Sequence, residues 1–514
     1  MTRYCRPMLA ALITISAHVV TIVPAAATWD HAHGDSANTG FAQVDTAPAV
    51  SPLRSVELGT LAPGAGPVIG PSGMLYVGNM HGKVLAFQPD GTPAWTKLLP
   101  LGDPFLASPV VDAEGFVYVA SSRKDQGRTK EGTFTHYEAG LLKLSGDTGD
   151  IAWIAPFPGI ATGRAARITG GPVAAAPPSI WRSGSVEVVV IPVTYNYASG
   201  VELRLLAFAP QNGALLGNTV VSSKRLEVSG SWFDDLDLAQ LTCAAVAIAT
   251  EPAALPICGI SYHEPYLGDY FATSWPMPGL AIAPDRAGPP LVIVSDWLNR
   301  DTVGYRFDSA TGFSEAFRVH DAARAKTSTP TVVPDGHIVM GTGDSNNLNR
   351  GRVTFPGPAT PHLADTPLAE RRNWGWIAAA PTRMRDGKIV VIGIVGKMYV
   401  LQANANTLFG RFTLNGESIA AAAASCTHLY VASDGAFTTF DAKTLQQVAQ
   451  FPWAGGGLSS PVIGPKGFVY GVSHATDKRD FLVVWPPPAA RPPSTKVIAT
   501  TCDPVVVRPP VVHQ

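Results

Sequence analysis

The feature that most constrains this chain is a short phrase that recurs along it. The phrase reads Gly-Pro-Val-Ile-Gly-Pro at residues 66–71 and Ser-Pro-Val-Ile-Gly-Pro at residues 460–465. In both places a glycine turn and an aliphatic–aromatic strand follow. Such a repeat predicts a unit that buries its apolar face only against neighbouring copies. We therefore expect one large repeat array in this chain rather than several unlike domains.

Eight segments qualify as repeat starts because each has a proline or alanine before a short apolar strand. Most of the starts are about 40–60 residues apart, which leaves room for four short strands and their turns. The starts are residues 67–68, 108–111, 171–173, 277–279, 328–331, 380–382, 420–424 and 461–462.

The second half of each repeat has a signature of its own. A buried strand ends, aspartate or asparagine with glycine reverses the chain, and an edge strand follows. The best copies open this edge strand with tryptophan, as in residues 89–95 and 146–153. Less complete copies lie near residues 212–213, 311–312, 404–406 and 443–445.

These motifs resemble the pyrroloquinoline-quinone-like (PQQ-like) repeat family, whose blades carry a pattern near Ala-x-Asp-x-x-Thr-Gly-x-x-x-Trp. Residues 147–149 with Trp153 match the pattern, and Asp90 with Trp95 is a looser copy. Residues 29–40 look like the lead-in of the same family. The resemblance covers about residues 29–486. It implies an all-β fold, an exported eight-bladed β-propeller of four-stranded antiparallel blades.

The two ends of the array predict how the ring closes. The last repeat supplies three strands, at residues 461–463, 468–472 and 481–485, before three prolines end the pattern. Residues 52–58 provide a spare strand just before the first repeat. We expect this N-terminal strand to complete the last blade, because an open sheet edge would otherwise remain.

The N-terminal residues have the pattern of a cleaved signal peptide. Arg3 and Arg6 precede an apolar run at residues 9–23 and a small-residue cleavage site at residues 25–27. An uncleaved anchor is the alternative. We predict a signal peptide at 1–27, the propeller at 28–485 with an insertion at about 222–275, and a proline-rich tail at 486–514. The mature protein is expected to be periplasmic or secreted, with no membrane span.

The charge composition of the chain argues against nucleic acid as a partner. The formal net charge is −1 and charged residues make up 15% of the chain, so no electrostatic pattern for nucleic acid is present. After cleavage four cysteines remain, and an even number in an exported chain suggests two disulfides. Three pairings exist; we favour Cys243–Cys258 and Cys426–Cys502. Free buried thiols are the alternative.

A few polar and aromatic residues are candidates for a binding site. Asp344, Asn346 and Asn349 carry oxygen ligands of the kind calcium uses, although a polar turn explains them without metal. The sequence at Asp30, His31, His33 and Asp35 has metal-ligand spacing, but the lead-in resemblance accounts for it. The acidic run at 234–237 could face a cationic or sugar ligand, or form a solvated loop.

Three tryptophans next to glycines could stack on a planar cofactor or a sugar, and ordinary packing between blades is the alternative. They are Trp374, Trp376 and Trp453.

The motifs favour binding over catalysis. The chain has no Gly-x-Ser-x-Gly elbow, phosphate loop or His-Glu-x-x-His helix. It also lacks the adjacent cysteines that quinoprotein dehydrogenases of this superfamily commonly place over their cofactor. We therefore expect a non-catalytic binding or scaffolding module without a cofactor. Its partner would be an envelope or extracellular protein or a small ligand. The alternative is a dehydrogenase of alcohols or sugars that depends on PQQ and calcium.

Overall fold

The protein is described here from a computed structural model. The residues that the structure describes are 29–100, 107–129, 132–159, 169–174, 176–197, 200–225, 279–285, 288–296, 298–320, 325–326, 328–333, 337–344, 347–355, 364–365, 377–402, 408–453, 455–474 and 479–489. Regular structure in these residues consists of strands alone. No helix that could cross a membrane occurs among them.

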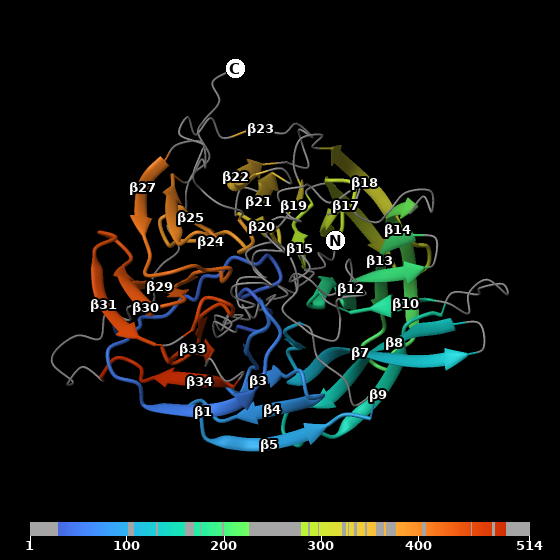
Figure 1. The fold of residues 1–514 in the computed structure, drawn as a ribbon, viewed down its shortest axis with the longest axis horizontal. Coiled ribbons are helices and arrows are strands. Elements are labelled where there is room, and N and C mark those ends of the chain that lie inside the picture. Colours follow the sequence, from blue (N-terminus) through green and yellow to red (C-terminus); the bar gives the residue numbers. More distant parts are fainter. Residues whose placement is uncertain are drawn as a thin grey trace, which may run out of the picture.

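The strands form seven sheets that surround a common axis (Figure 1). One sheet has nine strands and contains two blades, so the ring has eight blades, and the predicted fold class is confirmed. Blade 1 contains β2 (Val68–Ile69), β3 (Leu75–Gly78), β4 (Lys83–Phe87) and β5 (Pro93–Leu98). Blade 2 contains β6 (Val110–Val111), β7 (Phe116–Thr129), β8 (Gly132–Ser145) and β9 (Ile151–Pro156).

The next three blades follow in chain order. Blade 3 contains β11 (Ser179–Ser183), β12 (Val186–Tyr197), β13 (Gly200–Phe208) and β14 (Leu215–Arg225), and β10 (Thr169–Val173) joins it to blade 2. Blade 4 contains β15 (Leu280–Ala283), β16 (Leu291–Asp296), β17 (Asp301–Asp308) and β18 (Gly312–His320). Blade 5 contains β19 (Ala325–Lys326), β20 (Thr331–Val332), β21 (Ile338–Asp344), β22 (Asn347–Phe355) and β23 (Ala364–Asp365).

The last three blades complete the ring. Blade 6 contains β24 (Thr382–Arg383), β25 (Ile389–Gly393), β26 (Lys397–Leu401) and β27 (Leu408–Thr413). Blade 7 contains β28 (Ala423–Ala424), β29 (His428–Ser433), β30 (Ala436–Asp441) and β31 (Gln447–Pro452). Blade 8 contains β32 (Val462–Ile463), β33 (Val469–His474) and β34 (Asp480–Trp485) from the end of the chain, and β1 (Arg54–Gly59) from its beginning.

Ring closure occurs as the sequence predicts. Strand β1 pairs antiparallel with β34, with Arg54 opposite Val484 and Glu57 opposite Phe481. The outer strand of blade 8 therefore comes from the other terminus, and blade 8 has no open edge there.

Burial along the strands follows their place in a blade. The second strand of blade 4, β16, is buried at every residue, whereas the outer strands β5, β27 and β31 alternate between exposed and half-buried residues. This difference arises because middle strands contact neighbouring blades on both faces, while outer strands line the rim of the ring.

Seven of the eight predicted repeat starts coincide with inner strands or lead directly into them, and the third is wrong. Residues 171–173 lie in β10, which pairs with β8 on one side and β12 on the other. The inner strand of blade 3 is β11, which begins at Ser179 after two prolines and pairs with β12. Of the predicted insertion, residues 222–225 lie in β14, and those that follow are outside the described residues.

The two faces of the ring differ. Because neighbouring strands in a blade are antiparallel, the turns after the first and third strands lie on one face, which we call the turn face. The hairpins between second and third strands, and the connections between blades, lie on the opposite hairpin face. The turn face has tight glycine turns such as Gly73 and Gly91, with φ of +85° and +81°. On the hairpin face β7 and β8 are each 14 residues long, compared with 4 residues in β3.

The Asp-Gly-Trp signature links blade 1 to blade 2 and blade 2 to blade 3 on the turn face. The Trp95 indole nitrogen donates a hydrogen bond to the Gly146 carbonyl at 2.8 Å, and Trp153 donates to the Pro210 carbonyl at 3.0 Å. Gly149 has φ of +72°, and a Cβ there would lie 2.7 Å from the Trp95 ring. Both the backbone conformation and the close approach of the ring therefore require glycine at this position.

Substituting Gly149 by alanine is expected to lower the free energy of unfolding by about 2–4 kcal/mol, since left-handed strain and displacement of the Trp95 ring add together. Gly184→Ala is the matched control, because Gly184 also has positive φ, +58°, but nothing lies within 4 Å of its Cβ position. The control should cost about 1 kcal/mol. Urea denaturation followed by circular dichroism measures both, and equal losses would contradict the packing role of Gly149.

Candidate functional site

The lead-in segment, residues 29–49, lies across the centre of the ring, where Figure 1 shows it in dark blue. It accepts an amide hydrogen bond from the inner strand of each of the first seven blades, in chain order. Six of these bonds go to backbone carbonyls at 2.7–2.9 Å, and one goes to a histidine side chain. The donors are Ile69, Val111, Ile180, Ile282, Val332, Arg383 and Ala424.

The lead-in segment lies toward the turn face. Five of its seven donors are the last residues of their inner strands, directly before a turn of that face. The segment then leaves the centre at blade 7, where Thr46 contacts Ser425 through a 2.7 Å hydroxyl–hydroxyl hydrogen bond. Backbone groups of the inner strands that would otherwise face the axis are thereby satisfied.

His31 is fully engaged within this scaffold. Its Nε2 accepts the Ile180 amide proton at 3.2 Å, so Nδ1 carries the proton that it donates to the Asp30 carboxylate at 2.6 Å. The ring is 3% exposed, and this tautomer leaves neither nitrogen free to bind a metal. The Asp30–His31 pair therefore connects the lead-in to blade 3.

The two other polar residues of the predicted metal pattern differ: the buried Nδ1 of His33 has no hydrogen-bond partner among the described residues, whereas the Asp35 carboxylate accepts several hydrogen bonds. Burial lowers the pKa of His33 to about 4, so the imidazole is neutral at physiological pH. Asp35 accepts hydrogen bonds from the backbone amides of Ala37 and Thr39, both at 3.0 Å, and from the Thr39 hydroxyl at 2.7 Å. Both carboxylate oxygens of Asp35 thus shape the turn that follows it.

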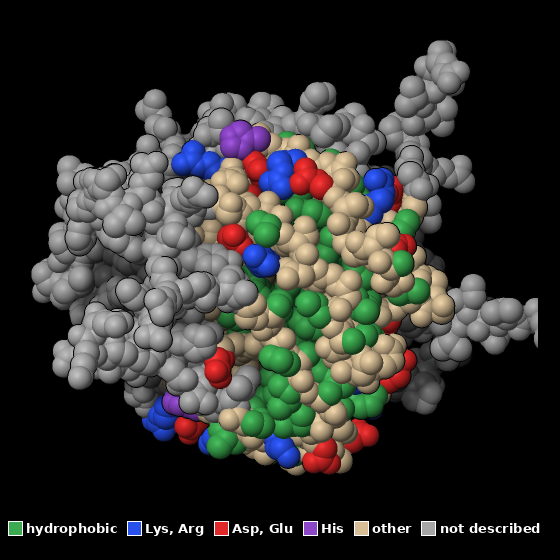
Figure 2. Space-filling model, turned by 90° about the vertical axis from the view of Figure 1, so that its right-hand side faces the viewer, with side chains coloured by type: hydrophobic (Ala, Val, Ile, Leu, Met, Phe, Trp, Pro, Cys, Tyr) green, Lys and Arg blue, Asp and Glu red, His purple; other side chains and the backbone are tan. Residues whose placement is uncertain are grey.

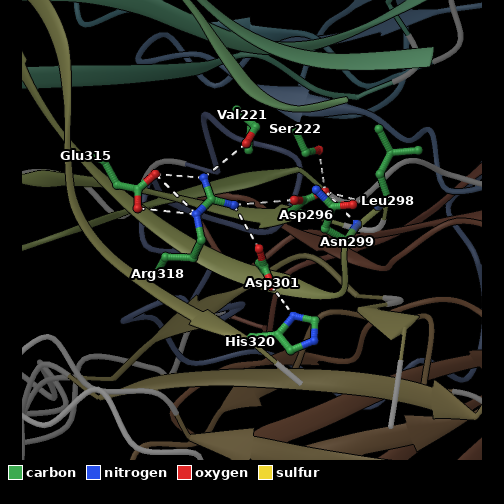
Figure 3. A network of polar contacts seen from close by, with 9 residues as sticks. All are labelled: Val221, Ser222, Asp296, Leu298, Asn299, Asp301, Glu315, Arg318 and His320. Atoms are coloured by element: carbon green, nitrogen blue, oxygen red, sulfur yellow. Dashed lines mark hydrogen bonds and ion pairs between the residues drawn. The ribbon is translucent and has the colours of Figure 1, made fainter. Parts of the chain in front are cut away.

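A second polar cluster lies between blades 3 and 4, close to the hairpin face (Figure 3). Arg318, on the outer strand β18, donates to the carboxylate of Asp301 at 2.8 Å, to Glu315 at 2.7 Å and to the Val221 carbonyl at 3.0 Å. Its Nη1 also lies 3.6 Å from the carboxylate of Asp296. Strand register creates this cluster, because Asp301 at the start of β17 is paired with His320 at the end of β18.

Asp296 is the buried member of this cluster. It has no exposed surface, and its Oδ1 accepts bonds from the Ser222 hydroxyl at 2.7 Å and the Leu298 amide at 3.0 Å. Burial raises its pKa above the ordinary value, against the opposing effects of the Ser222 hydroxyl and the Arg318 charge. His320 is held by a 2.6 Å hydrogen bond between its Nδ1 and Asp301, while its side chain is 60% exposed. The imidazole of His320 is thus exposed to solvent, and its orientation is fixed by Asp301, which is itself paired with Arg318.

The raised pKa of Asp296 predicts a pH dependence of stability. The folded state binds the Asp296 proton more tightly than the unfolded state, so this residue's contribution to stability falls as pH rises above the ordinary aspartate pKa of about 3.9. We expect the unfolding free energy of the wild type minus that of Asp296→Asn to decrease with pH, by at most about 1.4 kcal/mol per pH unit. Urea titrations from pH 4 to 7 measure this difference, and a flat or rising curve would contradict the assignment.

Of the three predicted stacking tryptophans, Trp453 lies within the described residues. Its indole nitrogen donates to the Ser433 carbonyl at 2.9 Å, and its ring packs edge-on against Phe437 at 5.1 Å and tilted against Trp485 at 6.3 Å. These contacts place Trp453 in the packing between blades 7 and 8. Trp374 and Trp376 lie outside the described residues.

The other predicted site residues are only partly placed. Asp344 ends β21 and Asn349 lies in the next strand, β22, while Asn346 falls outside the described residues. Cys426 lies in the turn between β28 and β29, where its amide donates to the Val44 carbonyl of the lead-in at 3.0 Å. Cys243, Cys258, Cys502 and the acidic run 234–237 are outside the described part of the chain.

The described residues do not fit the calcium that quinoprotein chemistry would require. Their one convergent acidic set is Asp112, Glu114 and Glu187. Asp112 already accepts the Tyr118 hydroxyl at 2.8 Å and lies 3.8 Å from Nζ of Lys143. At the ring centre, the carboxylates of Asp30 and Asp35 are held by the lead-in itself. Two of the three carboxylates in the acidic set are thus already paired, Asp112 with Tyr118 and Lys143 and Glu187 with Arg182, which leaves fewer free oxygen ligands than calcium needs.

The sequence did not identify the Arg318 cluster as a candidate site. Arg318 and His320 alternate with hydrophobic residues on an edge strand, which is also the pattern of an ordinary solvated face. The pair Asp296 and Asp301 could have indicated the cluster from the sequence. Two carboxylates that are buried close together need a cation nearby to offset their charge.

The geometry defines a class: an all-β propeller of eight blades, sealed by a strand from the other terminus and filled at its centre by its own lead-in segment. Residues 26–247 match the PQQ-like repeat model described as "Outer membrane protein assembly factor BamB". This match confirms the resemblance to propellers with PQQ-like repeats. No curated protein matches the chain.

Several solved structures are similar to this chain at low identity. They include BamB from Moraxella catarrhalis, at 12% identity and a TM-score of 0.48, covering 85% of this chain and 100% of that one. Another is the quinohemoprotein alcohol dehydrogenase from Comamonas testosteroni, at 12% identity and a TM-score of 0.47, covering 89% of this chain and 80% of that one. A third is Sqt1 from Saccharomyces cerevisiae, at 10% identity and a TM-score of 0.49, covering 86% of this chain and 98% of that one.

Proposed function

We propose that this protein is an exported, non-catalytic propeller with PQQ-like repeats that binds an envelope or extracellular protein through its hairpin face. Export rests on the signal-peptide pattern of residues 1–27. The pairs Cys243–Cys258 and Cys426–Cys502 belong to the same proposal, because disulfides form in exported proteins.

One observation carries the proposal: the long β-structure of blades 2 and 3 on the hairpin face. The hairpin of β7 and β8 pairs along its full length from Phe116–Ser145 to Thr129–Gly132. Strand β10 joins it to the long hairpin of β12 and β13, so one sheet spans two blades. A blade needs only short strands to pack in the ring, so this extra length serves another purpose, and long paired strands suit recognition of a protein.

The neighbouring side of the ring supports the same proposal. Leu215 and Val220 on β14 are exposed hydrophobic side chains, at 43% and 44%. Figure 2 shows this side of the molecule, where hydrophobic side chains gather and few charges lie among them. A mixed apolar surface of this kind is typical of protein interfaces.

The test shortens the hairpin and follows partner binding. Replacing residues 124–137 by Asn-Gly joins Arg123 to Glu138, which are opposite each other in the ladder, through a two-residue turn. We expect the variant to keep the circular dichroism spectrum and to lose at least about tenfold in recovery of the envelope protein that cross-links to the wild type. The control is Lys466→Glu, an exposed residue on the turn face, which should keep the partner.

Two results would contradict the proposal. Equal cross-linking by the shortened variant would exclude the hairpin as the binding surface. A calcium-dependent change in quinone absorbance on titration with pyrroloquinoline quinone, together with dye-coupled alcohol or sugar oxidation, would establish the dehydrogenase instead.

A further inference from the structure

Arg383 is the exception among the seven inner-strand residues that donate to the lead-in segment. The other six are aliphatic and at most 8% exposed: Ile69, Val111, Ile180, Ile282, Val332 and Ala424. Their side chains join the hydrophobic clusters between blades. Blade 6 alone among these seven places a charged side chain at this position. The backbone of Arg383 keeps the shared role, since its amide donates to the Thr39 carbonyl at 2.8 Å.

The Arg383 guanidinium has no hydrogen bond or ion pair with any described residue. Its side chain is half-buried, and its Nε is buried without an acceptor. Cζ lies 6.0 Å from the centre of the Phe41 ring, and Asp35 is the one carboxylate whose charge acts on it. No ion pair forms with Asp35, whose two oxygens accept from Ala37 and Thr39 instead.

This arrangement is unfavourable for the protein alone. Burial of part of a cation costs free energy unless an anion or an acceptor replaces the water it loses, and the buried Nε of Arg383 gains neither. Burial accordingly lowers the pKa of Arg383 below its usual value. An aliphatic residue, as in the six equivalent blades, would fill the position without that cost. The arginine is therefore better explained by a group that binds to it than by the fold.

We propose that Arg383 binds the carboxylate of a small ligand beside the lead-in segment, next to Phe41. A guanidinium presents donors in a planar fork that matches the two oxygens of a carboxylate, and such charge-assisted pairs are strong where water is partly excluded. The Phe41 ring provides an apolar surface beside the Arg383 guanidinium. This site does not depend on the protein-binding surface proposed above.

The test measures carboxylate binding by calorimetry and thermal unfolding at constant ionic strength, with succinate, acetate and inorganic phosphate as probes. We expect succinate and acetate to bind the full-length mature protein and raise its Tm. Arg383→Ile, which copies the other blades, should bind them at least about tenfold more weakly. Without ligand this variant should be at least as stable as the wild type, since it removes an unpaired cation.

Two further variants distinguish a ligand site from a structural charge. Asp35→Asn keeps the acceptor for Ala37 and Thr39 but removes the nearby negative charge, so it should bind succinate more tightly than the wild type. Arg383→Lys keeps the positive charge but lacks the planar pair of guanidinium donors, so it should bind succinate more weakly than the wild type. Equal succinate binding by Arg383→Ile, a response to phosphate alone, or no response of the wild type to any probe would each overturn the proposal. So would a ligand-free Arg383→Ile protein clearly less stable than the wild type.

Discussion

A chain shortened to begin at Ser51, which keeps β1 but lacks the lead-in segment, is expected to lose on the order of 10 kcal/mol of unfolding free energy. Six backbone hydrogen bonds to the inner strands contribute about 1 kcal/mol each, and the burial of Trp29 contributes about 3–5 kcal/mol. Urea denaturation followed by circular dichroism measures the loss.

Trp29→Ala separates the two contributions, because it removes the buried ring and leaves the backbone bonds in place. Trp29 is 1% exposed, and its carbonyl accepts from Ile69 at 2.7 Å. We expect this variant to lose about 3–5 kcal/mol. A shortened chain no less stable than Trp29→Ala would show that the lead-in bonds contribute nothing.

Substituting Arg318 by methionine is expected to cost about 3 kcal/mol, because it leaves the buried carboxylates of Asp296 and Asp301 without their cation. This figure is at the lower end for a broken buried pair, since the Arg318 side chain is 30% exposed and water screens part of its charge. Midpoints of urea denaturation at neutral pH measure it.

The matched control is Arg306→Met on the neighbouring strand β17. Arg306 pairs with Asp285 at 2.8 Å, but its side chain is 44% exposed, so the loss should stay below about 1 kcal/mol. Adding Asp301→Asn to Arg318→Met should recover part of the stability by removing one unpaired charge. Equal losses for the two arginine variants would contradict a special role for the Arg318 cluster.

The fold could be predicted from the sequence because each blade repeats the same local chemistry. Proline and β-branched residues start the inner strands, and glycine turns such as Gly149 receive the tryptophan of the preceding blade. The third start was misplaced because residues 171–173 and the segment before Ser179 satisfy the same pattern. Only the pairing of β10 with β8 and β12 distinguishes them, and that pairing depends on hairpins far longer than the repeat requires.

The candidate sites were harder to predict because their residues meet only in the folded ring. The Arg318 cluster joins residues from 221 to 320 through strand register. The unusual character of Arg383 appears only when seven inner strands are aligned by their bonds to the lead-in. In sequence it is one arginine after Pro-Thr, with no neighbour that points to a ligand.

The path of the lead-in segment also has a consequence for the order in which the protein folds. Residues 29–42 contact inner strands up to Ala424, and β1 pairs with β34 near the other end of the chain. These contacts give the molecule a high contact order, so folding is expected to be slow. The residues made first also cannot reach their final partners until the last blades have been made. A chain that emerges N-terminus first therefore stays incomplete until its end is available, and its unsealed strand edges need protection from aggregation during that time.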